Sequence, residues 1–357
     1  YFEAPQAHVQ ARDLLLAQPA EAAAQRACRL ELARTYNLLA AGMPGRGPWS
    51  GRSGRPGRPS PKTGPFSGLA AEAVANRKKA LDILKTLVEE DPKNPKYQLD
   101  LARTYRDLSV AARRHHSEEA GQARQEAVRI LQKLVADYPA NPDYSFELAE
   151  TYAVLGRRHF RGPGRPPENG SNKLDEAIQI EARLVERYPN VPQYHAALAR
   201  LYVEQSRVQQ ATGRPDDAEK SLRQAVALRR ALAERFAEAP QYQGELARDL
   251  FMLAYSCRKR GRTADARDAL EQAIRALEAL PQTGRGGGFA RMMLARAYQS
   301  LAELLGQRGK TAPAAEAARK AEQLGIKAGT PPRGPFRFDR GRRPPHGRPK
   351  RDHAKGP

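Results

Sequence analysis

The phrase LARTY occupies residues 32–36 and returns unchanged at residues 101–105. Close copies follow, reading LAETY at 148–152, LARLY at 198–202, LARDL at 246–250 and LARAY at 294–298. The leading leucines of these six copies are 69, 47, 50, 48 and 48 residues apart. A phrase that returns at a nearly constant interval indicates an array of internal repeats, and the repeat must be settled before any other feature is interpreted.

Each middle phrase is preceded by a Pro-x-Tyr motif, at Pro95–Tyr97, Pro142–Tyr144, Pro192–Tyr194 and Pro240–Tyr242. Proline is accepted in the first turn of a helix because the N–H that it lacks would have no partner inside the helix. Apolar residues then follow at helical spacing and form one face. The pattern predicts one amphipathic helix in each repeat, which we call helix A.

A second helix, helix B, is predicted after each helix A. Its copies read ALDILKTLVEEDP from Ala80, AVRILQKLVADYP from Ala127 and AIQIEARLVERYP from Ala177, and a looser copy starts at Ala225. In the first three copies a proline stands twelve positions after the alanine and predicts the end of the helix. Each repeat is therefore predicted to be a helical hairpin, and stacked hairpins predict an all-α solenoid with a shared core.

The predicted array runs over residues 1–327, and two Gly-, Pro- and Arg-rich inserts interrupt it at 42–67 and 157–172. Both inserts fall in the turn between helix A and helix B. Residues 328–357 form a basic tail with too much proline and charge to bury a core, so the inserts and the tail are predicted to be disordered. The array is expected to form a helical-hairpin superhelix that carries these disordered basic segments.

The net charge of +21 is concentrated in these segments. The insert at 42–67 carries a net charge of +5, the insert at 157–172 carries +3, and residues 329–357 carry +7. The remaining A-to-B turns are also basic, as in Arg113–His116, Arg258–Arg262, and Arg308 with Lys310. Two interpretations stay open: a cationic edge that binds anions, or cations that merely favour the carboxyl ends of helices.

Few residues are arranged for chemistry. Cys28 and Cys257 are the only cysteines, and no His, Cys or acidic spacing resembles a metal site. The glycine-rich stretch at 284–288 follows no predicted strand, so a nucleotide loop is not expected. We therefore expect a non-enzyme that needs no cofactor and no metal.

The chain has no apolar run long enough for a membrane helix, and its first residues do not resemble a signal peptide. A cytoplasmic protein is therefore expected. Residues 9–16 resemble the end of a helix B whose partner helix would lie before Tyr1, so the chain is expected to be a fragment of a longer protein.

Helix A resembles the tetratricopeptide repeat, in which a leucine, a small residue and an aromatic residue share one face. Leu148, Ala149 and Tyr152 carry this resemblance, as do the helix B alanines and the closing prolines. The chain departs from the family in its period of about 48 residues and in the absence of the early tryptophan of helix A. The sequence of the repeats also resembles the C-terminal repeat regions of large bacterial serine/threonine protein kinases, although the chain contains no kinase motif.

The resemblance implies that helix A lines a concave groove in which a partner peptide lies. The residue two positions after each leading leucine is then expected to face this groove. Five of the six residues at this position are arginines, namely Arg34, Arg103, Arg200, Arg248 and Arg296, and the sixth is Glu150. We call this set the arginine column; its guanidinium groups could hold the carboxylates or phosphates of an acidic peptide.

An ordinary structural role competes with this interpretation. Glu31, Asp100 and Glu245 stand three residues before Arg34, Arg103 and Arg248, and such pairs form common salt bridges on a helix surface. Arg200 and Arg296 have Ala197 and Met293 in that place, which makes them the better ligand candidates.

Three hypotheses about function follow from the sequence. The first is a protein-binding scaffold for a protein or an acidic peptide, and the second is the regulatory or docking half of a kinase. The third is a nucleic-acid-associated protein that acts through its basic inserts and tail. The identity of the partner and the oligomeric state are not encoded in any motif.

Overall fold

The structure is a computed structural model, and it describes residues 3–16, 22–42, 66–111, 118–156, 170–281, 284–307 and 311–325. Within these ranges every regular element is an α-helix. This confirms the predicted all-α hairpin architecture. The chain divides into two compact units, Tyr1–Thr212 and Gly213–Pro357, which are described separately.

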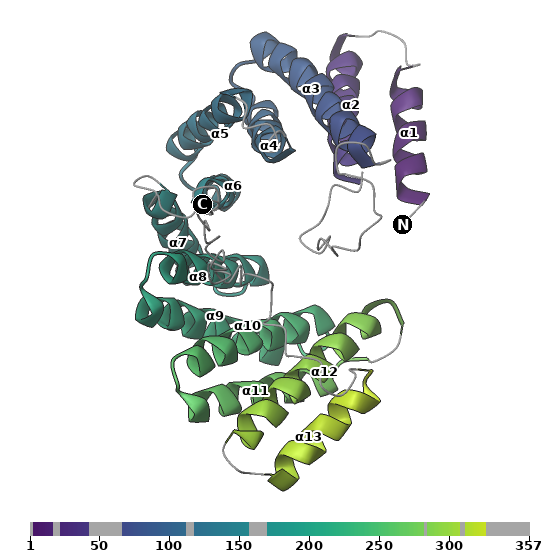
Figure 1. Cartoon of the computed structure of the whole chain (residues 1–357). Coiled ribbons are helices and arrows are strands. Elements are labelled where there is room, and N and C mark those ends of the chain that lie inside the picture. Colours follow the sequence, from purple (N-terminus) through teal and green to yellow (C-terminus); the bar gives the residue numbers. More distant parts are fainter. Residues whose placement is uncertain are drawn as a thin grey trace, which may run out of the picture. The chain divides into compact units, whose positions relative to one another are not determined.

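The described residues of unit 1 form eight helices, coloured purple to teal in Figure 1. They are α1 (Glu3–Leu16), α2 (Ala22–Gly42), α3 (Phe66–Glu90), α4 (Pro95–Ala111), α5 (Glu118–Asp137), α6 (Pro142–Gly156), α7 (Gly170–Arg187) and α8 (Pro192–Ala211). Each helix packs against the next along the chain, and α2, α4 and α6 also contact one another in succession. These even-numbered helices are the predicted A helices, so consecutive A helices share one face of unit 1.

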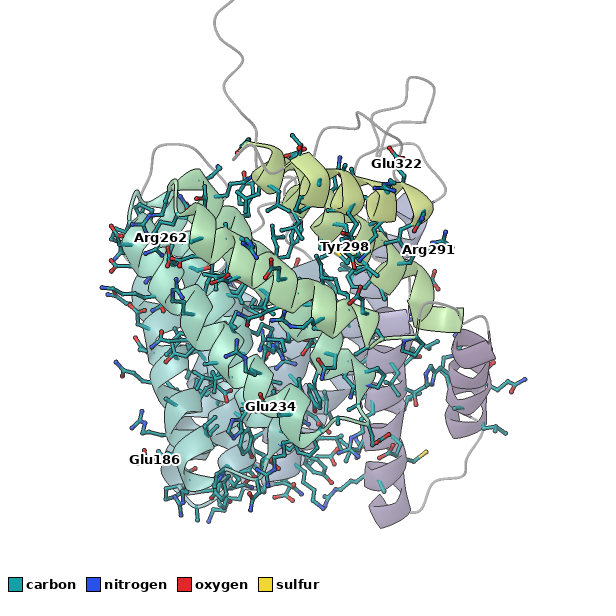
Figure 2. The ribbon with its side chains drawn as sticks, turned by 90° about the horizontal axis from the view of Figure 1, so that it is seen from below. Glu186, Glu234, Arg262, Arg291, Tyr298 and Glu322 are labelled. Carbon is teal, nitrogen blue, oxygen red and sulfur yellow. The ribbon has the colours of Figure 1, made fainter. Side chains whose placement is uncertain are left out.

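In the part of unit 2 that the structure describes there are five helices, drawn in green to yellow in Figure 1. They are α9 (Pro215–Arg235), α10 (Pro240–Lys259), α11 (Thr263–Glu278), α12 (Gly284–Gly306) and α13 (Thr311–Gln323). The same packing in chain order holds here, and the A helices α10 and α12 touch. In α12, Tyr298 lies beneath Lys320 of α13, and the Arg291 side chain donates to carbonyls at the end of α13, near Glu322 (Figure 2).

The alanines of the repeat lie where the helices approach most closely. Those that follow the leading leucines are almost fully buried, namely Ala33, Ala102, Ala149, Ala199, Ala247 and Ala295. The helix B alanines Ala80, Ala127, Ala177 and Ala225 are also fully buried. A methyl group is the largest side chain that fits at such close helix crossings. The small positions of the motif therefore set the spacing of the stack.

Prolines and aromatic residues define the corner between helix B and the next helix A. The helices α4, α6, α8 and α10 begin at the prolines of the Pro-x-Tyr motifs, as predicted. The tyrosine of that motif packs edge-on or tilted against the aromatic residue that closes the preceding helix B. The pairs are Tyr138–Tyr144, Tyr188–Tyr194 and Phe236–Tyr242, with ring centroids 5.8, 6.0 and 5.7 Å apart. Such aromatic pairs fix the angle at which the next repeat starts.

The ends of two predicted inserts differ slightly from expectation. Helix α3 already begins at Phe66 and α7 at Gly170, before the positions where the inserts were predicted to stop. The differences are small, two residues at the start of α3 and three at the start of α7. The rest of both inserts and the tail from residue 328 lie outside the described residues, so their predicted disorder stays a prediction.

Candidate partner-binding face

The arginine column lies on the A helices, on the face along which these helices contact one another. Arg34 is in α2, Arg103 in α4 and Arg200 in α8 of unit 1, and Arg248 and Arg296 are in α10 and α12 of unit 2. The side chains of Arg34, Arg103, Arg200 and Arg248 are 42, 41, 32 and 32% exposed. They are therefore accessible to a partner but not freely extended into solvent.

In unit 1 these arginines bridge successive A helices. Arg34 Nε lies 2.8 Å from Asp100 Oδ2, so α2 is tied to α4. Arg103 Nη2 lies 2.6 Å from Glu147 Oε1, so α4 is tied to α6 in the same register. In both cases the arginine reaches the acid one position before the leading leucine of the next repeat. The column therefore forms an inter-repeat ion-pair ladder.

Glu150 is the one acidic member of the column, and it pairs with the next member, Arg200 of α8. Helix α8 has Ala197 where α4 and α6 have Asp100 and Glu147, so the ladder changes its register at this step. The sequence analysis favoured Arg200 because no acid precedes it by three residues. The structure supplies an acid from the preceding repeat instead, which the spacing within one helix could not reveal.

Helix α6 carries acidic side chains and no Lys or Arg, and it lies between two helices that provide arginines. Glu147, which is nearly buried, is contacted by both Arg103 and Arg106 of α4. The salt bridges at i,i+3 expected for Arg34 and Arg103 are also present, to Glu31 at 2.7 Å and to Asp100 at 3.8 Å. The acids of the ladder thus neutralise much of the positive charge that the sequence predicted for this face.

Unit 2 arranges its column differently. Arg248 lies 3.7 Å from its chain neighbour Asp249, while Glu245, the acid expected to pair with it, pairs with Arg229 of α9. Arg229 is buried, and its Nε lies 3.5 Å from Asp249 Oδ2. Arg296 is half-buried in α12. Arg248 is therefore less firmly held by acids than Arg34 or Arg103.

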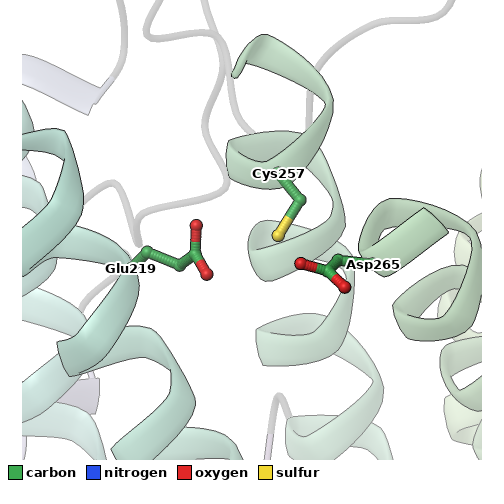
Figure 3. Close-up of side chains that lie close together, drawn as sticks. All are labelled: Glu219, Cys257 and Asp265. Carbon is green, nitrogen blue, oxygen red and sulfur yellow. The ribbon is translucent and has the colours of Figure 1, made fainter. Parts of the chain in front are cut away.

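A second cluster sits at the turn between α10 and α11. Glu219, Cys257 and Asp265 bring ligand-type atoms within 4.8 Å of one another, and Figure 3 shows the Cys257 sulfur pointing between the two carboxylates. Gly261 has a φ of 72° and so allows the tight turn that contains its neighbours Arg260 and Arg262. The three groups come from three different helices, α9, α10 and α11, so no local sequence motif contains them.

The partners of this cluster decide its chemistry. Glu219 is paired with Arg223 at 2.9 Å, with Arg260 at 3.3 Å and with Arg262. Burial raises the pKa of the Cys257 thiol, which disfavours the thiolate that a metal would need. A divalent cation here would also face three guanidinium groups. The cluster is an ion-pair junction that joins α9 to the α10–α11 turn, and it accounts for the basic turn of unit 2 without an anion ligand.

A shallow pocket of about 300 Å³ opens in unit 1 between α5, α6 and α7. Val135, Leu148, Tyr152 and Ile180 line it, and Gln132 donates to the Tyr152 hydroxyl at 2.9 Å. Ala136 borders the pocket at a position where other B helices carry the exposed glutamates Glu89, Glu186 and Glu234, the last two labelled in Figure 2. The B helix of this repeat therefore has no glutamate at the edge of the pocket.

One buried residue was missed by the sequence analysis. Glu181 of α7 is fully buried, and neither of its carboxyl oxygens has a hydrogen-bond partner. Burial, reinforced by the nearby charge of Glu150 and opposed by Arg200, raises the pKa of Glu181 to about 9. The signal was present in the sequence, because Glu181 stands four residues after the helix B alanine, where the first two repeats have leucine.

Comparison with known proteins supports the repeat assignment. Residues 199–232 match the family model of the tetratricopeptide repeat. The crystal structure of BtubC (BKLC) from P. vanneervenii is similar with a TM-score of 0.50 at 13% identity, over 71% of this chain and 90% of that one. No curated protein matches the chain. The family match is confined to residues 199–232, and the solved structure shares the helical-hairpin fold of this chain.

Two further solved structures are similar at lower TM-scores. A thermophilic TPR protein of Thermus thermophilus has a TM-score of 0.33 at 23% identity, over 65% of this chain and 95% of that one. The kinesin light chain TPR-like repeats of Podosopora anserina have a TM-score of 0.36 at 22% identity, over 65% and 96%. The resemblance to kinase repeat regions stays a prediction.

Proposed function

We propose that the chain is a non-catalytic protein-interaction scaffold that holds a segment of a partner protein against its A helices. Helical repeats of this type commonly mediate protein–protein interaction, and their stacked helices offer an extended surface. Among the described residues, no helix is long and apolar enough to cross a membrane. The observation that supports the proposal is the arginine column, whose members remain partly exposed along one face of each unit.

The ion-pair ladder refines the expected partner. Arg34, Arg103 and Arg200 already contact acids of the chain, so a partner carboxylate has to compete with those acids. Exposed salt bridges contribute only about 0.2–1 kcal/mol, so a bidentate carboxylate or phosphate can displace them. We therefore propose an acidic or phosphorylated segment as the ligand, and Arg200 and Arg296, the two candidates that the sequence favoured, are the contacts to test first.

A binding experiment with paired variants tests this proposal. Fluorescence anisotropy would measure the affinity of the full chain for acidic and phosphorylated peptides selected from a library. Arg200→Ala should weaken binding about tenfold, which corresponds to about 1.4 kcal/mol. Glu150→Ala should strengthen it, because this change releases Arg200 from its internal partner.

The matched control is Arg183→Ala, an exposed arginine on helix B of the same unit, which should leave affinity unchanged. Circular dichroism would verify that each variant keeps its helix content. Equal affinity of the wild type, Arg200→Ala and Arg296→Ala would rule out the column as the ligand contact.

The nucleic-acid hypothesis rests on the inserts and the tail, which lie outside the described residues. Of the four cations of the one fully described basic turn, Arg258, Arg260 and Arg262 are paired with acids, and Lys259 lies over the ring of Tyr255. Binding to DNA or RNA therefore stays a prediction about those segments, and its test is salt-dependent binding that is lost when they are deleted.

A further inference from the structure

One core position of helix B changes its chemistry along the array. The residue four positions after the helix B alanine is Leu84 in α3 and Leu131 in α5, and both leucines are fully buried. In α7 the same position holds Glu181, which is equally buried. A carboxyl group thus occupies a place that the repeat reserves for an apolar side chain.

The surroundings of Glu181 come from the two helices that pack against α7, namely α6 and α8. On α6 the charge of Glu150 acts on the Glu181 carboxyl group, and on α8 the charge of Arg200 does. Tyr194 of α8 is the third titratable group close enough to sense the charge of Glu181. Two carboxyl groups therefore compete for one guanidinium group at this point in unit 1.

The observed pairing is unequal. Arg200 contacts Glu150, while the oxygens of Glu181 have no partner at all. A buried carboxylate without a partner is costly, so the carboxyl group is held in its neutral, protonated form. The same cost disappears once a cation supplies charge and hydrogen bonds to the ionised group.

We propose that Arg200 is a shared partner of Glu150 and Glu181, and that proton loss from Glu181 draws Arg200 away from Glu150 into the core. The proton passes to solvent, and the guanidinium group exchanges one carboxylate for the other. Glu150 is then left unpaired on the A-helix face. The charge of that face between α6 and α8 is therefore set by the protonation state of a core residue.

The exchange concerns side chains of the chain itself, so it stands whether or not the face binds a partner. It also implies linkage. A cationic group that binds Glu150 would release Arg200 and favour proton loss from Glu181. An anionic group that binds Arg200 would keep Glu181 protonated.

Carbon-13 NMR of the full chain labelled at glutamate side-chain carboxyl carbons tests the proposal. The pH is raised from below the ordinary glutamate value to beyond 9, and Glu181→Gln identifies the Glu181 signal. We expect the Glu181 signal to titrate near pH 9 and the Glu150 signal to shift at the same midpoint, because Glu150 then loses its partner. In Glu181→Gln the shift of the Glu150 signal should vanish.

Two controls separate exchange from general effects of alkaline pH. Glu186→Gln removes an exposed glutamate of the same helix and should leave the Glu150 shift intact. Glu181→Leu restores the residue type of the first repeats and should abolish the shift even if the glutamine variant folds poorly. The proposal is overturned if Glu181 titrates near its ordinary value. It is equally overturned if the Glu150 signal ignores the titration of Glu181.

Discussion

Glu181 in unit 1 and Arg229 in unit 2 occupy the same position of helix B, yet the protein treats them in opposite ways. Both side chains are buried, and both replace the leucine of the first two repeats. Arg229 has two acids beside it, Glu245 and Asp249 of α10. Glu181 has no hydrogen-bond partner, and its nearest cation is engaged with Glu150.

The difference teaches how a repeat accepts a charge in its core. A guanidinium group cannot lose its proton in a protein, so a buried arginine must be given counter-charges. A carboxyl group can become neutral, so a buried glutamate can be accommodated without them, with a raised pKa as the result. Arg229 is therefore a fixed structural link, whereas Glu181 keeps a protonation equilibrium.

Removal of the Arg229 guanidinium group, which is paired with acids, should have the largest effect on the free energy of unfolding. Arg229→Leu leaves Asp249 and Glu245 without their shared cation inside unit 2, and breaking a buried ion pair costs about 3–5 kcal/mol. We expect a loss of this size in the free energy of unfolding of α9 and α10, measured by hydrogen exchange of their amides in the full chain.

The control for this prediction is the double change Arg229→Leu with Asp249→Leu, which removes the buried acid as well and should recover most of the loss. If Arg229→Leu lowers the free energy of unfolding by less than about 1 kcal/mol, Arg229 is not a structural link.

In unit 1, removal of the buried carboxyl group by Glu181→Leu should stabilise the protein. Glu181 has an unfolded pKa of 4.5 and a folded pKa of about 9, so it binds its proton more tightly in the folded state. The stability that the folded state gains from binding this proton is fully present below pH 4.5 and is lost as the pH rises toward 9. At pH 7 the penalty amounts to about 3 kcal/mol, and Glu181→Leu should remove it.

Amide exchange of α7, followed from about pH 5 to about pH 9, measures this effect, because the wild type should lose protection as the pH rises and the leucine variant should not. The outcome against the prediction is an α7 of equal stability at both ends of that range in the wild type.

A smaller effect is expected in the ion-pair ladder. Glu147→Gln takes the shared partner from Arg103 and Arg106, but Arg103 is partly exposed to solvent and Arg106 keeps Asp107 at 3.1 Å. We expect a loss of about 1–2 kcal/mol, between the values for exposed and buried ion pairs. Urea denaturation at low and high salt measures it, and the difference between wild type and variant should shrink at high salt. A loss that salt leaves unchanged would mean that packing, and not charge, joins α4 to α6.

The smallest effect sharpens the contrast between core and surface positions of helix B. Ala136→Glu restores the residue type found at Glu89, Glu186 and Glu234 and covers the shallow pocket with an exposed side chain. The change in stability should stay within about 0.5 kcal/mol. A thermal melt followed by circular dichroism measures the change, and a larger loss would show that this position does not tolerate the glutamate of the other repeats.

Much of the fold could be predicted because the sequence states it locally. The Ala and Pro positions are dictated by helix contact and helix start, so Ala102 or Pro142 could be placed without coordinates. The site was harder, because the partners of Arg103 and Arg200 come from neighbouring repeats, about one period away in sequence. Glu181 could have been found by aligning the B helices, but its lack of a partner depends on where Arg200 points.

The charge distribution of α6 has a consequence for the order of the repeats. Helix α6 presents only acids, and it receives arginines from the repeat before it and from the repeat after it. A second copy of this hairpin inserted beside the first would set acid against acid, whereas the apolar core would accept the duplication. The apolar core would thus accept the hairpins in any order, whereas the ion pairs between A helices allow only certain neighbours. The order of the repeats is therefore fixed by charge.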